Sequence, residues 1–427
     1  MATLFILFIS YDTFRKMNLS ERFLQIRDFL KPYQRIWQNE IMLMYPDPLS
    51  GYPLEWIEDL RRFKAKSDVI RLEKKDVFDL ISSPSLISFY REIEALCSLP
   101  QKETYPPLPE DSFTWLFMIP KKQHEIRNLA PHLNHLYRKT NVDEMLDIGG
   151  GIGLLAQTMN NYYQTKITSL DMDPILQKTG KTRHEKNAKD PLNKVLYKNV
   201  KVEDQGEFSE LLNRRIMPVG LHTCGKLALD IIRVSAAKKV PAMVNFGCCY
   251  HTLDKTPDLQ NLSRFAKDND PIWINKFALT LSCRAHRKMD EKDYDLKLKV
   301  KLYRYAIHIL LHDHYGIKEL VTLGNSSPKL YDETFGVYAY EQFKRIHLSP
   351  THSIEELNSF FEDSELQILI ERMLAAGLIR NALGRVMEIY LLLDRAIYLQ
   401  EQGYKVQVQE FFDEELSPRN IGITAVL

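Results

Sequence analysis

A short apolar segment followed by closely spaced glycines constrains the fold of this chain more than any other feature. Residues 144–148 read as a buried strand, Gly149, Gly151 and Gly153 follow, and a helical pattern continues over 152–163. Glycine permits positive φ angles and lets a ligand approach the backbone closely. A glycine loop between a parallel strand and a helix is typical of sites for nucleotide-like cofactors. The loop therefore predicts a cofactor site at the carboxyl end of a sheet.

The segments after this loop alternate between strand and helix. Helices are predicted after Pro174 and Gly225, and the further strands are at 166–170, 194–200, 219–222 and 242–246. Such alternation indicates a parallel sheet with helices on both faces. The predicted fold class is therefore α/β, with a Rossmann-like sheet.

Two segments near the end of the chain supply what this sheet still lacks. A strongly apolar helix is predicted over 386–402, and strands over 404–412 and 421–427 are joined by a turn at 416–420. Serine, proline and asparagine favour such turns. Together with the five earlier strands, these segments would complete a seven-stranded sheet.

The rest of the chain predicts a three-part organisation. A helical N-terminal region with a proline-rich linker occupies 1–140, and a mostly helical insertion occupies 251–380. The Rossmann-like core is then 141–250 plus 381–427. At 427 residues, the chain is long enough for two or three domains.

Composition predicts a cytoplasmic protein. The five cysteines are too few and too scattered for a disulfide framework, which favours a reducing compartment. No apolar run reaches the roughly 18 residues that span a bilayer. The apolar start at 1–10 has no positive segment before it, so a signal peptide is a weak alternative, and Met17 is a second candidate for the start instead of Met1. The net charge of +1 does not indicate a nucleic-acid binder.

The glycine spacing favours S-adenosylmethionine over a dinucleotide. The dinucleotide pattern G-x-G-x-x-G fails because Leu154 stands at its third glycine position. Asp147, two residues before Gly149, would repel a pyrophosphate but attract the ammonium and sulfonium of adenosylmethionine. Asp171, at the next strand end, can bind ribose hydroxyls, and Met172 follows it in the same candidate site. A nucleotide-dependent oxidoreductase and an unrelated glycine turn stay as alternatives.

The ends of the fourth and fifth strands carry the candidate catalytic residues. His222 is a candidate base, because its ordinary pKa lies near 6.5. A cysteine with a lowered pKa could act as a nucleophile, and a tyrosine could stack on a planar acceptor. Ordinary packing is the alternative for each of them. The candidates are His222, Cys224, Cys248, Cys249 and Tyr250.

The same segments contain close pairs of soft metal ligands. None has the regular C-x-x-C spacing of a zinc signature, so we expect no bound metal, with zinc as the alternative. The pairs are His222 with Cys224, Cys249 with His251, and Cys283 with His286.

These motifs, in this order, resemble the methyltransferase-like protein 25 family. The resemblance implies a Rossmann-like fold with an adenosylmethionine site, and a role at its edge for Lys121, Lys122, His124 and Glu125. A solvated helix start, in which the two lysines need no partner, is the alternative for this segment. Relatives are labelled as ribosomal RNA adenine dimethylase domain proteins, but the N/D-P-P-Y/F motif of adenine N6 enzymes is absent here. The matching motifs, besides the glycine loop, are KKQHE at 121–125, GLHTCG at 220–225, GCCYH at 247–251 and LSPRN at 416–420.

The function predicted from these features is methylation by an adenosylmethionine-dependent transferase. The large additions around the core favour a macromolecular acceptor, and basic and aromatic stretches at 284–288 and 303–305 favour RNA slightly over protein. Solvated helix faces and core aromatics are the alternative for those stretches. A non-catalytic binding or scaffold protein on the same fold is the alternative function. The acceptor atom and the oligomeric state are not indicated by the sequence.

Overall fold

The computed structural model describes most of the chain. Met1, Met17, the basic stretch 284–288 and His286 lie outside the described residues. The described residues are 18–63, 69, 79–100, 105–109, 115, 118–187, 195–203, 205–255, 260–283, 291–319, 321, 323 and 326–427.

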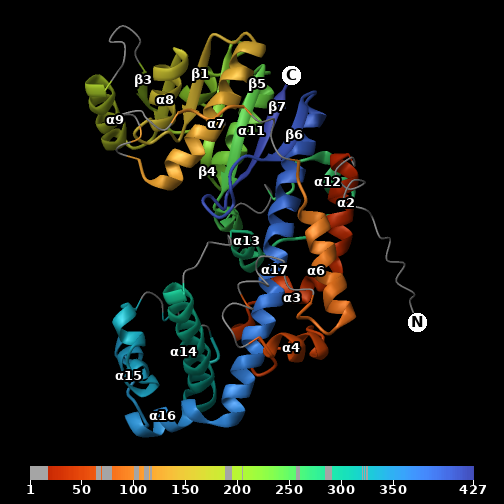
Figure 1. The fold of residues 1–427 in the computed structure, drawn as a ribbon, viewed down its shortest axis with the longest axis vertical. Helices are drawn as coiled ribbons and strands as arrows, with labels where there is room; N and C mark the ends of the chain where they lie inside the picture. The colour runs from red at the N-terminus through yellow and green to blue at the C-terminus, as the bar shows by residue number, and fades with distance from the viewer. Residues whose placement is uncertain are drawn as a thin grey trace. The chain divides into compact units, whose positions relative to one another are not determined.

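Seven strands form one mixed sheet in the order β3-β2-β1-β4-β5-β7-β6 (Figure 1). The first five pair in parallel, and β7 is antiparallel to both β5 and β6. This confirms the predicted α/β fold with a Rossmann-like, seven-stranded sheet. The strands are β1 (Glu144–Ile148), β2 (Ile167–Asp171), β3 (Leu196–Asn199), β4 (Ile216–Cys224), β5 (Ala242–Cys248), β6 (Lys405–Glu410) and β7 (Ile421–Val426).

The central strands are buried along nearly their whole length. Every residue of β5 is buried, and so are four of the five residues of β1. Parallel strands covered on both faces read as continuous apolar runs, which is why these segments are recognisable in the sequence. The order of the strands brings the carboxyl ends of β1, β2, β4 and β5 to one edge of the sheet.

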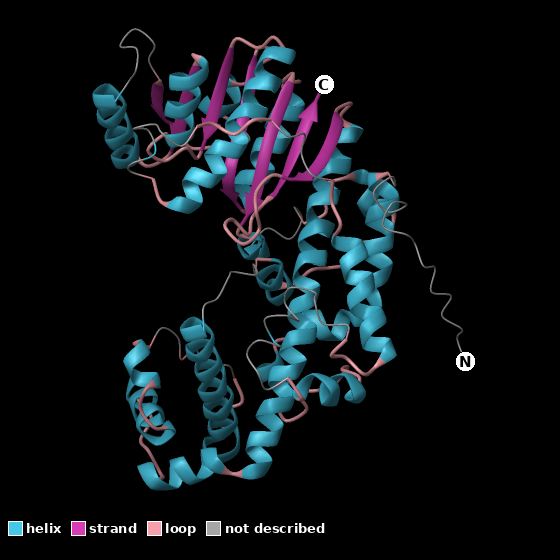
Figure 2. Cartoon of the chain, in the orientation of Figure 1, coloured by secondary structure: helices cyan, strands magenta, loops and turns pink. Residues whose placement is uncertain are grey.

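Helices connect and cover these strands (Figure 2). Helix α7 begins at Pro120. Proline suits the first helical position because it lacks a backbone N–H, and an N–H there would have no partner within the helix. Helix α7 packs on α8, while α9 packs on β2 and β3, and α11 on β4 and β5. The connecting helices are α7 (Pro120–Lys139), α8 (Leu154–Tyr163), α9 (Pro174–Asn187), α10 (Glu207–Leu211) and α11 (Lys226–Ala237).

The chain divides into two compact units. The first consists of the described residues of Met1–Lys31, Ala95–Arg287 and Gly384–Leu427, and contains the whole sheet. The second consists of those of Pro32–Glu94 and Lys288–Leu383. These units are defined by packing. The three-part domain organisation predicted from the sequence stays a prediction.

Further helices of the first unit lie outside the alternating core. Helix α2 begins after Asn18, whose side chain forms a capping box with Glu21. Its predicted apolar residues, among them Phe23 and Ile26, are buried. The elements are α2 (Leu19–Leu30), η4 (Tyr250–Lys255), α12 (Arg264–Asp268) and α13 (Lys276–Ser282).

The second unit is helical and has an aromatic core. Tyr303 packs edge-on against Phe335 and Phe361, with ring centroids 5.5 and 5.2 Å apart. Its elements are α3 (Gln34–Gln38), η2 (Ile41–Met44), α4 (Leu54–Arg61), α14 (Glu291–Tyr315), η6 (Pro328–Tyr331), α15 (Phe335–Arg345) and α16 (Ile354–Glu362).

Three elements include residues from both units: η1 (Lys31–Tyr33), α6 (Pro84–Cys97) and α17 (Ser364–Glu401). The helix predicted over 386–402 thus starts 22 residues earlier, at Ser364, because buried apolar residues such as Ile370 and Ile379 continue its pattern. In the part of the chain that the structure describes, no helix combines the length and apolar character needed to cross a membrane.

Candidate functional site

The glycine loop turns sharply between β1 and α8. Gly149, Gly151 and Gly153 have φ angles of 68°, 58° and 70°. The backbone N–H groups of Gly149 and Gly150 both donate to the carbonyl of Leu170, over 2.9 and 3.1 Å. These bonds fasten the start of the loop to the end of β2.

Asp171, the last residue of β2, lies directly beside the loop. Its Oδ2 accepts from the backbone N–H of Gly151 at 2.9 Å, and its Oδ1 accepts from that of Asp173 at 2.9 Å. An ionised carboxylate has about four acceptor positions, so these bonds leave capacity for the hydroxyl donors of a ligand. The neighbouring Met172 side chain is 72% exposed, which leaves an apolar surface beside the carboxylate.

Asp147, near the end of β1, is buried and only partly satisfied. It is 2% exposed, and its Oδ2 has no hydrogen-bond partner among the described residues. Burial raises the pKa of Asp147 to about 6, although the positive charge of Lys122 and a backbone hydrogen bond from Ala156 oppose the rise. A carboxylate in this state is stabilised by a cationic group close to it.

The two faces of the loop differ in the space they leave. A Cβ atom on Gly150 would lie 2.5 Å from Ser169 Oγ and 2.6 Å from Asp147 Oδ2. A Cβ on Gly151 would meet nothing closer than Leu176 Cδ1, at 4.0 Å. The loop is therefore packed tightly on its Gly150 side and open at Gly151, which is where a ligand can approach the backbone.

His222 lies at an irregularity in β4 and pairs with Glu125 of α7. The pairing of β4 with β5 shifts register between Gly220 and Thr223, and His222 has a φ of 65°. Non-glycine residues rarely adopt such angles, and they cluster at functional sites. The bulge brings His222 Nε2 to 2.6 Å from Glu125 Oε1.

Glu125 is fully buried and has several charged or polar partners. Besides His222, Ser417 Oγ donates to its Oε1 at 2.6 Å, and Lys122 Nζ lies 2.9 Å from its Oε2. Burial by itself would raise the pKa of Glu125, but His222, Lys122 and Ser417 outweigh it and lower the pKa to about 2. The carboxylate is therefore ionised at neutral pH and acts only as an acceptor.

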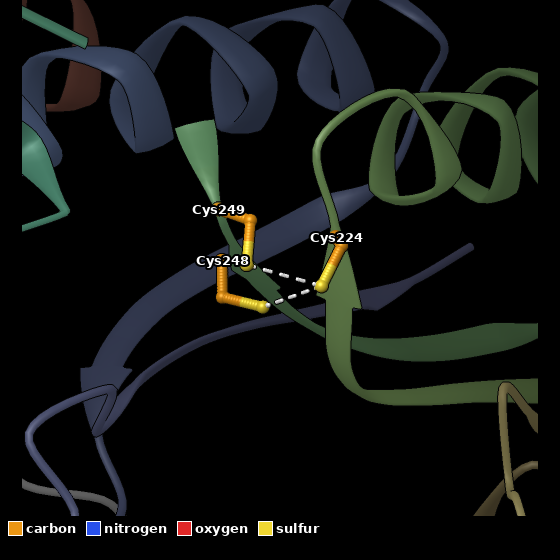
Figure 3. A group of neighbouring side chains, drawn as sticks. All are labelled: Cys224, Cys248 and Cys249. Atoms are coloured by element: carbon orange, nitrogen blue, oxygen red, sulfur yellow. Dashed lines mark hydrogen bonds between the residues drawn. The ribbon is translucent and has the colours of Figure 1, made fainter. Parts of the chain in front are cut away.

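The three candidate cysteines converge at the ends of β4 and β5 (Figure 3). Cys224 Sγ lies 3.1 Å from Cys249 Sγ and 3.4 Å from Cys248 Sγ. Burial is the largest cause that raises the pKa of both Cys224 and Cys248 above the ordinary value. A free thiolate nucleophile is not favoured by this environment, since nucleophilic cysteines need a lowered pKa.

Tyr250 lies inside the first unit. Its side chain is 2% exposed, and its hydroxyl donates to the carbonyl of Gly247 at 3.1 Å. The Arg395 guanidinium lies over its ring, 5.7 Å from the centroid. This packing leaves no open ring face for stacking on an acceptor, in contrast to the role considered for Tyr250 from the sequence.

The structure shows partners that the sequence reasoning missed. Gln157 and Gln177 hold the loop, with side-chain amides that donate at 2.9 Å to the carbonyls of Ile152 and Gly151, respectively. Isolated glutamines in helices carry no recognisable pattern. Ser417 could have been found, because it lies in the LSPRN segment that the sequence analysis singled out.

The remaining predicted ligand pairs are only partly described. Cys283 Sγ lies 3.6 Å from His251 Nδ1, so these two residues from different predicted pairs are neighbours. The third pair includes His286, which lies outside the described residues. Lys121 Nζ is 3.7 Å from Glu125 Oε1, and His124 Nε2 accepts from the backbone of Asp413 at 3.0 Å. The KKQHE segment thus contacts His222 through Glu125. Through His124 it also contacts Asp413, in the connection between β6 and β7.

Comparisons with known proteins match the part of the chain that carries these residues. Residues 121–256, which include the loop, Glu125, His222 and the three cysteines, match a family described as a methyltransferase domain. Over 225 residues, the chain is 27% identical to a mouse (Mus musculus) protein named "Probable methyltransferase-like protein 25", and 24% identical to the human (Homo sapiens) protein of that name. The matches cover 49% of this chain but only 37% and 36% of these relatives.

Proposed function

We propose that this chain, a member of the methyltransferase-like protein 25 family, is an S-adenosylmethionine-dependent methyltransferase. The observation that carries the proposal is the contact between Asp171 Oδ2 and the backbone N–H of Gly151, 2.9 Å long. It places a carboxylate with free acceptor capacity beside the open side of a glycine loop. That arrangement suits a nucleoside whose ribose hydroxyls donate to Asp171.

Several features of the loop fit the rest of this cofactor. The buried Asp147 Oδ2 without a hydrogen-bond partner is suited to the cationic end of adenosylmethionine. Met172, exposed next to Asp171, offers an apolar contact for a planar base. When bound, the cofactor supplies a methyl group activated by a sulfonium. The cofactor residues we propose are Asp147, Gly149, Gly151, Gly153, Asp171 and Met172.

His222 is the residue that we propose as the general base. Ionised Glu125 can only accept a hydrogen bond, so its contact with His222 Nε2 places the imidazole proton on that nitrogen. Nδ1 is then the ring nitrogen of His222 that remains to accept a proton. Glu125, held by Lys122 and Ser417, is a positioning residue for His222 rather than a ligand of the cofactor. For the same reason we propose that Lys122 supports Glu125.

The acceptor that we propose is a macromolecule, with RNA ahead of protein. The tyrosines that first favoured RNA do not support it, because Tyr303 and Tyr305 are buried in the second unit and cannot stack on bases. A different feature does. Helix α9 and strand β3 follow Asp171 in the chain and pack on each other. Both carry exposed lysines, which can bind phosphates. These lysines are Lys178, Lys181, Lys186 and Lys198.

Titration of the full chain with adenosylmethionine in a calorimeter tests the cofactor assignment. We expect binding, and a loss of about 1–3 kcal/mol in binding free energy for Asp171→Ala, the size of a charge-assisted hydrogen bond. Asp173→Ala is the control, since Asp173 caps the start of α9 through Ile175 rather than contacting the loop with its carboxylate. No binding of adenosylmethionine or of its demethylated product would refute the proposal.

The acceptor needs a separate experiment. The protein and labelled adenosylmethionine are incubated with extract from cells that lack the protein, and portions are then treated with ribonuclease or protease. We expect label that ribonuclease removes, and weaker labelling by a variant with Lys178→Glu and Lys181→Glu. Label removed only by protease would identify a protein acceptor instead. Cofactor binding without any labelled product would favour the scaffold alternative.

A further inference from the structure

The ends of β4 and β5 hold a cluster of thiols that the proposed methyl transfer does not use. Cys224 ends β4, Cys248 ends β5, and Cys249 follows directly. Their sulfur atoms all lie within 4.8 Å of one another. Figure 3 shows the three side chains directed toward a common point from the two strand ends. No other group of three histidine, cysteine or carboxylate side chains in the described residues is arranged this closely.

The backbone around the cluster is held in place by several hydrogen bonds. The N–H of Gly225 donates to the carbonyl of Cys248 at 2.8 Å and so links the two strand ends. The N–H and the hydroxyl of Thr252 donate to the carbonyl of Cys249 at 3.0 and 2.9 Å. Cys249 itself has a φ of 52°, a costly angle for a non-glycine residue. The fold therefore maintains the convergence of the sulfurs against local strain.

The spacing of the sulfurs suits a single soft metal ion. A tetrahedral zinc ion with Zn–S bonds of about 2.3 Å keeps its sulfur ligands roughly 3.8 Å apart. The sulfur–sulfur separations of 3.1 and 3.4 Å are slightly shorter, so small side-chain rotations would admit the ion. Thiolates select zinc and copper(I) over magnesium or calcium. Cys224 is exposed, which leaves an entry path from solvent.

We propose that Cys224, Cys248 and Cys249 together bind one soft metal ion, for which Zn²⁺ is the divalent species expected. Binding breaks three S–H bonds, forms three metal–sulfur bonds and releases the three protons to solvent. The proposal revises the expectation of no metal that follows from the sequence spacing. It is independent of the cofactor site at Asp171 and Gly151.

The spacing of these three cysteines along the chain matches no regular metal-binding motif. Cys224 and Cys248 are separated by 24 positions, but β4 and β5 are paired so that the two residues are direct neighbours. A regular C-x-x-C pair lies on one loop, whereas this set comes from the ends of two parallel strands. Only the sheet brings it together.

The test uses the full chain, purified under reducing conditions without chelators. It is titrated with Zn²⁺ against a coloured chelator, and separately with Co²⁺, whose thiolate complexes absorb in the near ultraviolet. We expect about one zinc ion per chain, proton release on binding, and a thiolate-to-cobalt absorption band. Cys224→Ser should weaken zinc binding at least about a hundredfold and remove the band. Because the Cys224 side chain is exposed, this variant is the one least able to disturb folding.

Cys97→Ser is the matched control, since Cys97 belongs to the same compact unit but not to the cluster. It should bind zinc like the natural chain. A wild-type chain with reduced thiols that takes up no zinc would overturn the proposal. So would equal zinc binding and equal cobalt spectra for Cys224→Ser and the natural chain, with thermal melting used to show that both are folded.

Discussion

Glu125 and His222 are 97 positions apart in the chain, yet His222 Nε2 lies 2.6 Å from Glu125 Oε1. The pair joins helix α7, which precedes the sheet, to the bulge in β4. Ser417, from the connection between β6 and β7, contacts the same Glu125 oxygen. Three separate segments of the chain therefore determine where the imidazole lies.

The first prediction concerns the pH dependence of stability through Glu125. Its pKa in the folded chain is about 2, below the ordinary 4.5, so its ionised form stabilises the fold. This contribution is fully present above about pH 4.5 and is lost as pH falls toward 2. Glu125→Gln should therefore lower the free energy of unfolding by about 2–3 kcal/mol at pH 7. The difference between the two proteins in thermal denaturation should shrink below about pH 4.5 and vanish only at about pH 2 and below.

Glu414→Gln is the control for this measurement, because Glu414 is an exposed glutamate in the same connection as Ser417. Its melting temperature should follow that of the natural chain at every pH. A Glu125→Gln variant whose deficit is the same at pH 7 and at pH 3 would show that packing, and not charge, accounts for the loss.

Asp147 gives the opposite prediction. Its folded pKa of about 6 is above the ordinary 3.8, so the folded chain holds this proton more tightly than the unfolded chain does. The ionised carboxylate of Asp147 therefore lowers the free energy of unfolding more and more as pH rises from about 4 to 6. Above pH 6 this reduction stays constant. Without cofactor, Asp147→Asn should melt at a higher temperature than the natural chain at pH 7, and the difference should shrink toward pH 4.

The change from Asp147 to asparagine should have the opposite effect on cofactor binding. If the buried carboxylate attracts the cationic end of adenosylmethionine, Asp147→Asn should bind the cofactor more weakly by on the order of 1–3 kcal/mol. Calorimetry at pH 7 measures that difference. Equal affinity in the two proteins would separate Asp147 from the cofactor, while the stability prediction would stand or fall on its own data.

The third prediction separates the two sides of the glycine loop. A methyl group on Gly151 has space within the protein but would protrude where the ligand approaches. Gly151→Ala should therefore lose adenosylmethionine binding while its melting temperature falls only by the cost of a φ of 58°, about 1 kcal/mol. Gly150→Ala, whose methyl would collide with Asp147 and Ser169, should lose stability instead.

Gly206→Ala controls for backbone strain in this comparison. Gly206 has a φ of 92° and a ψ of −159°, precedes helix α10, and a methyl group added to it would have no atom within 4 Å. Because this backbone region is open essentially only to glycine, the variant should lose at least as much stability as Gly151→Ala but keep its cofactor affinity. If Gly206→Ala and Gly151→Ala weaken binding equally, the loop has no specific role in binding.

The sequence predicted the sheet well, whereas the contacts among the candidate site residues could not be predicted from it, for a physical reason. Buried parallel strands are nearly continuous apolar runs, and the glycines of such a loop lie within a few positions of one another. Both features can therefore be recognised in a short stretch of sequence. The contacts of Glu125 with His222 and Ser417 depend on chain segments that only the fold brings together. The same is true of Cys224 and Cys248, which neighbouring strands align. Tyr250 was misjudged because its position next to a strand end says nothing about which way its side chain points.

The last prediction tests His222 as the general base. Asparagine is among the residues that tolerate a positive φ, so His222→Asn should still fold and bind adenosylmethionine, although its melting temperature should fall because the buried Glu125 loses its imidazole partner. Methyl transfer should fall by roughly 10²–10⁴, the usual contribution of a positioned base. His347→Asn is the control, since His347 is an exposed histidine with a φ of 55° in the second unit. A His222→Asn variant that keeps the natural rate of methyl transfer would exclude this base, and the imidazole would then serve only to satisfy the buried Glu125 carboxylate.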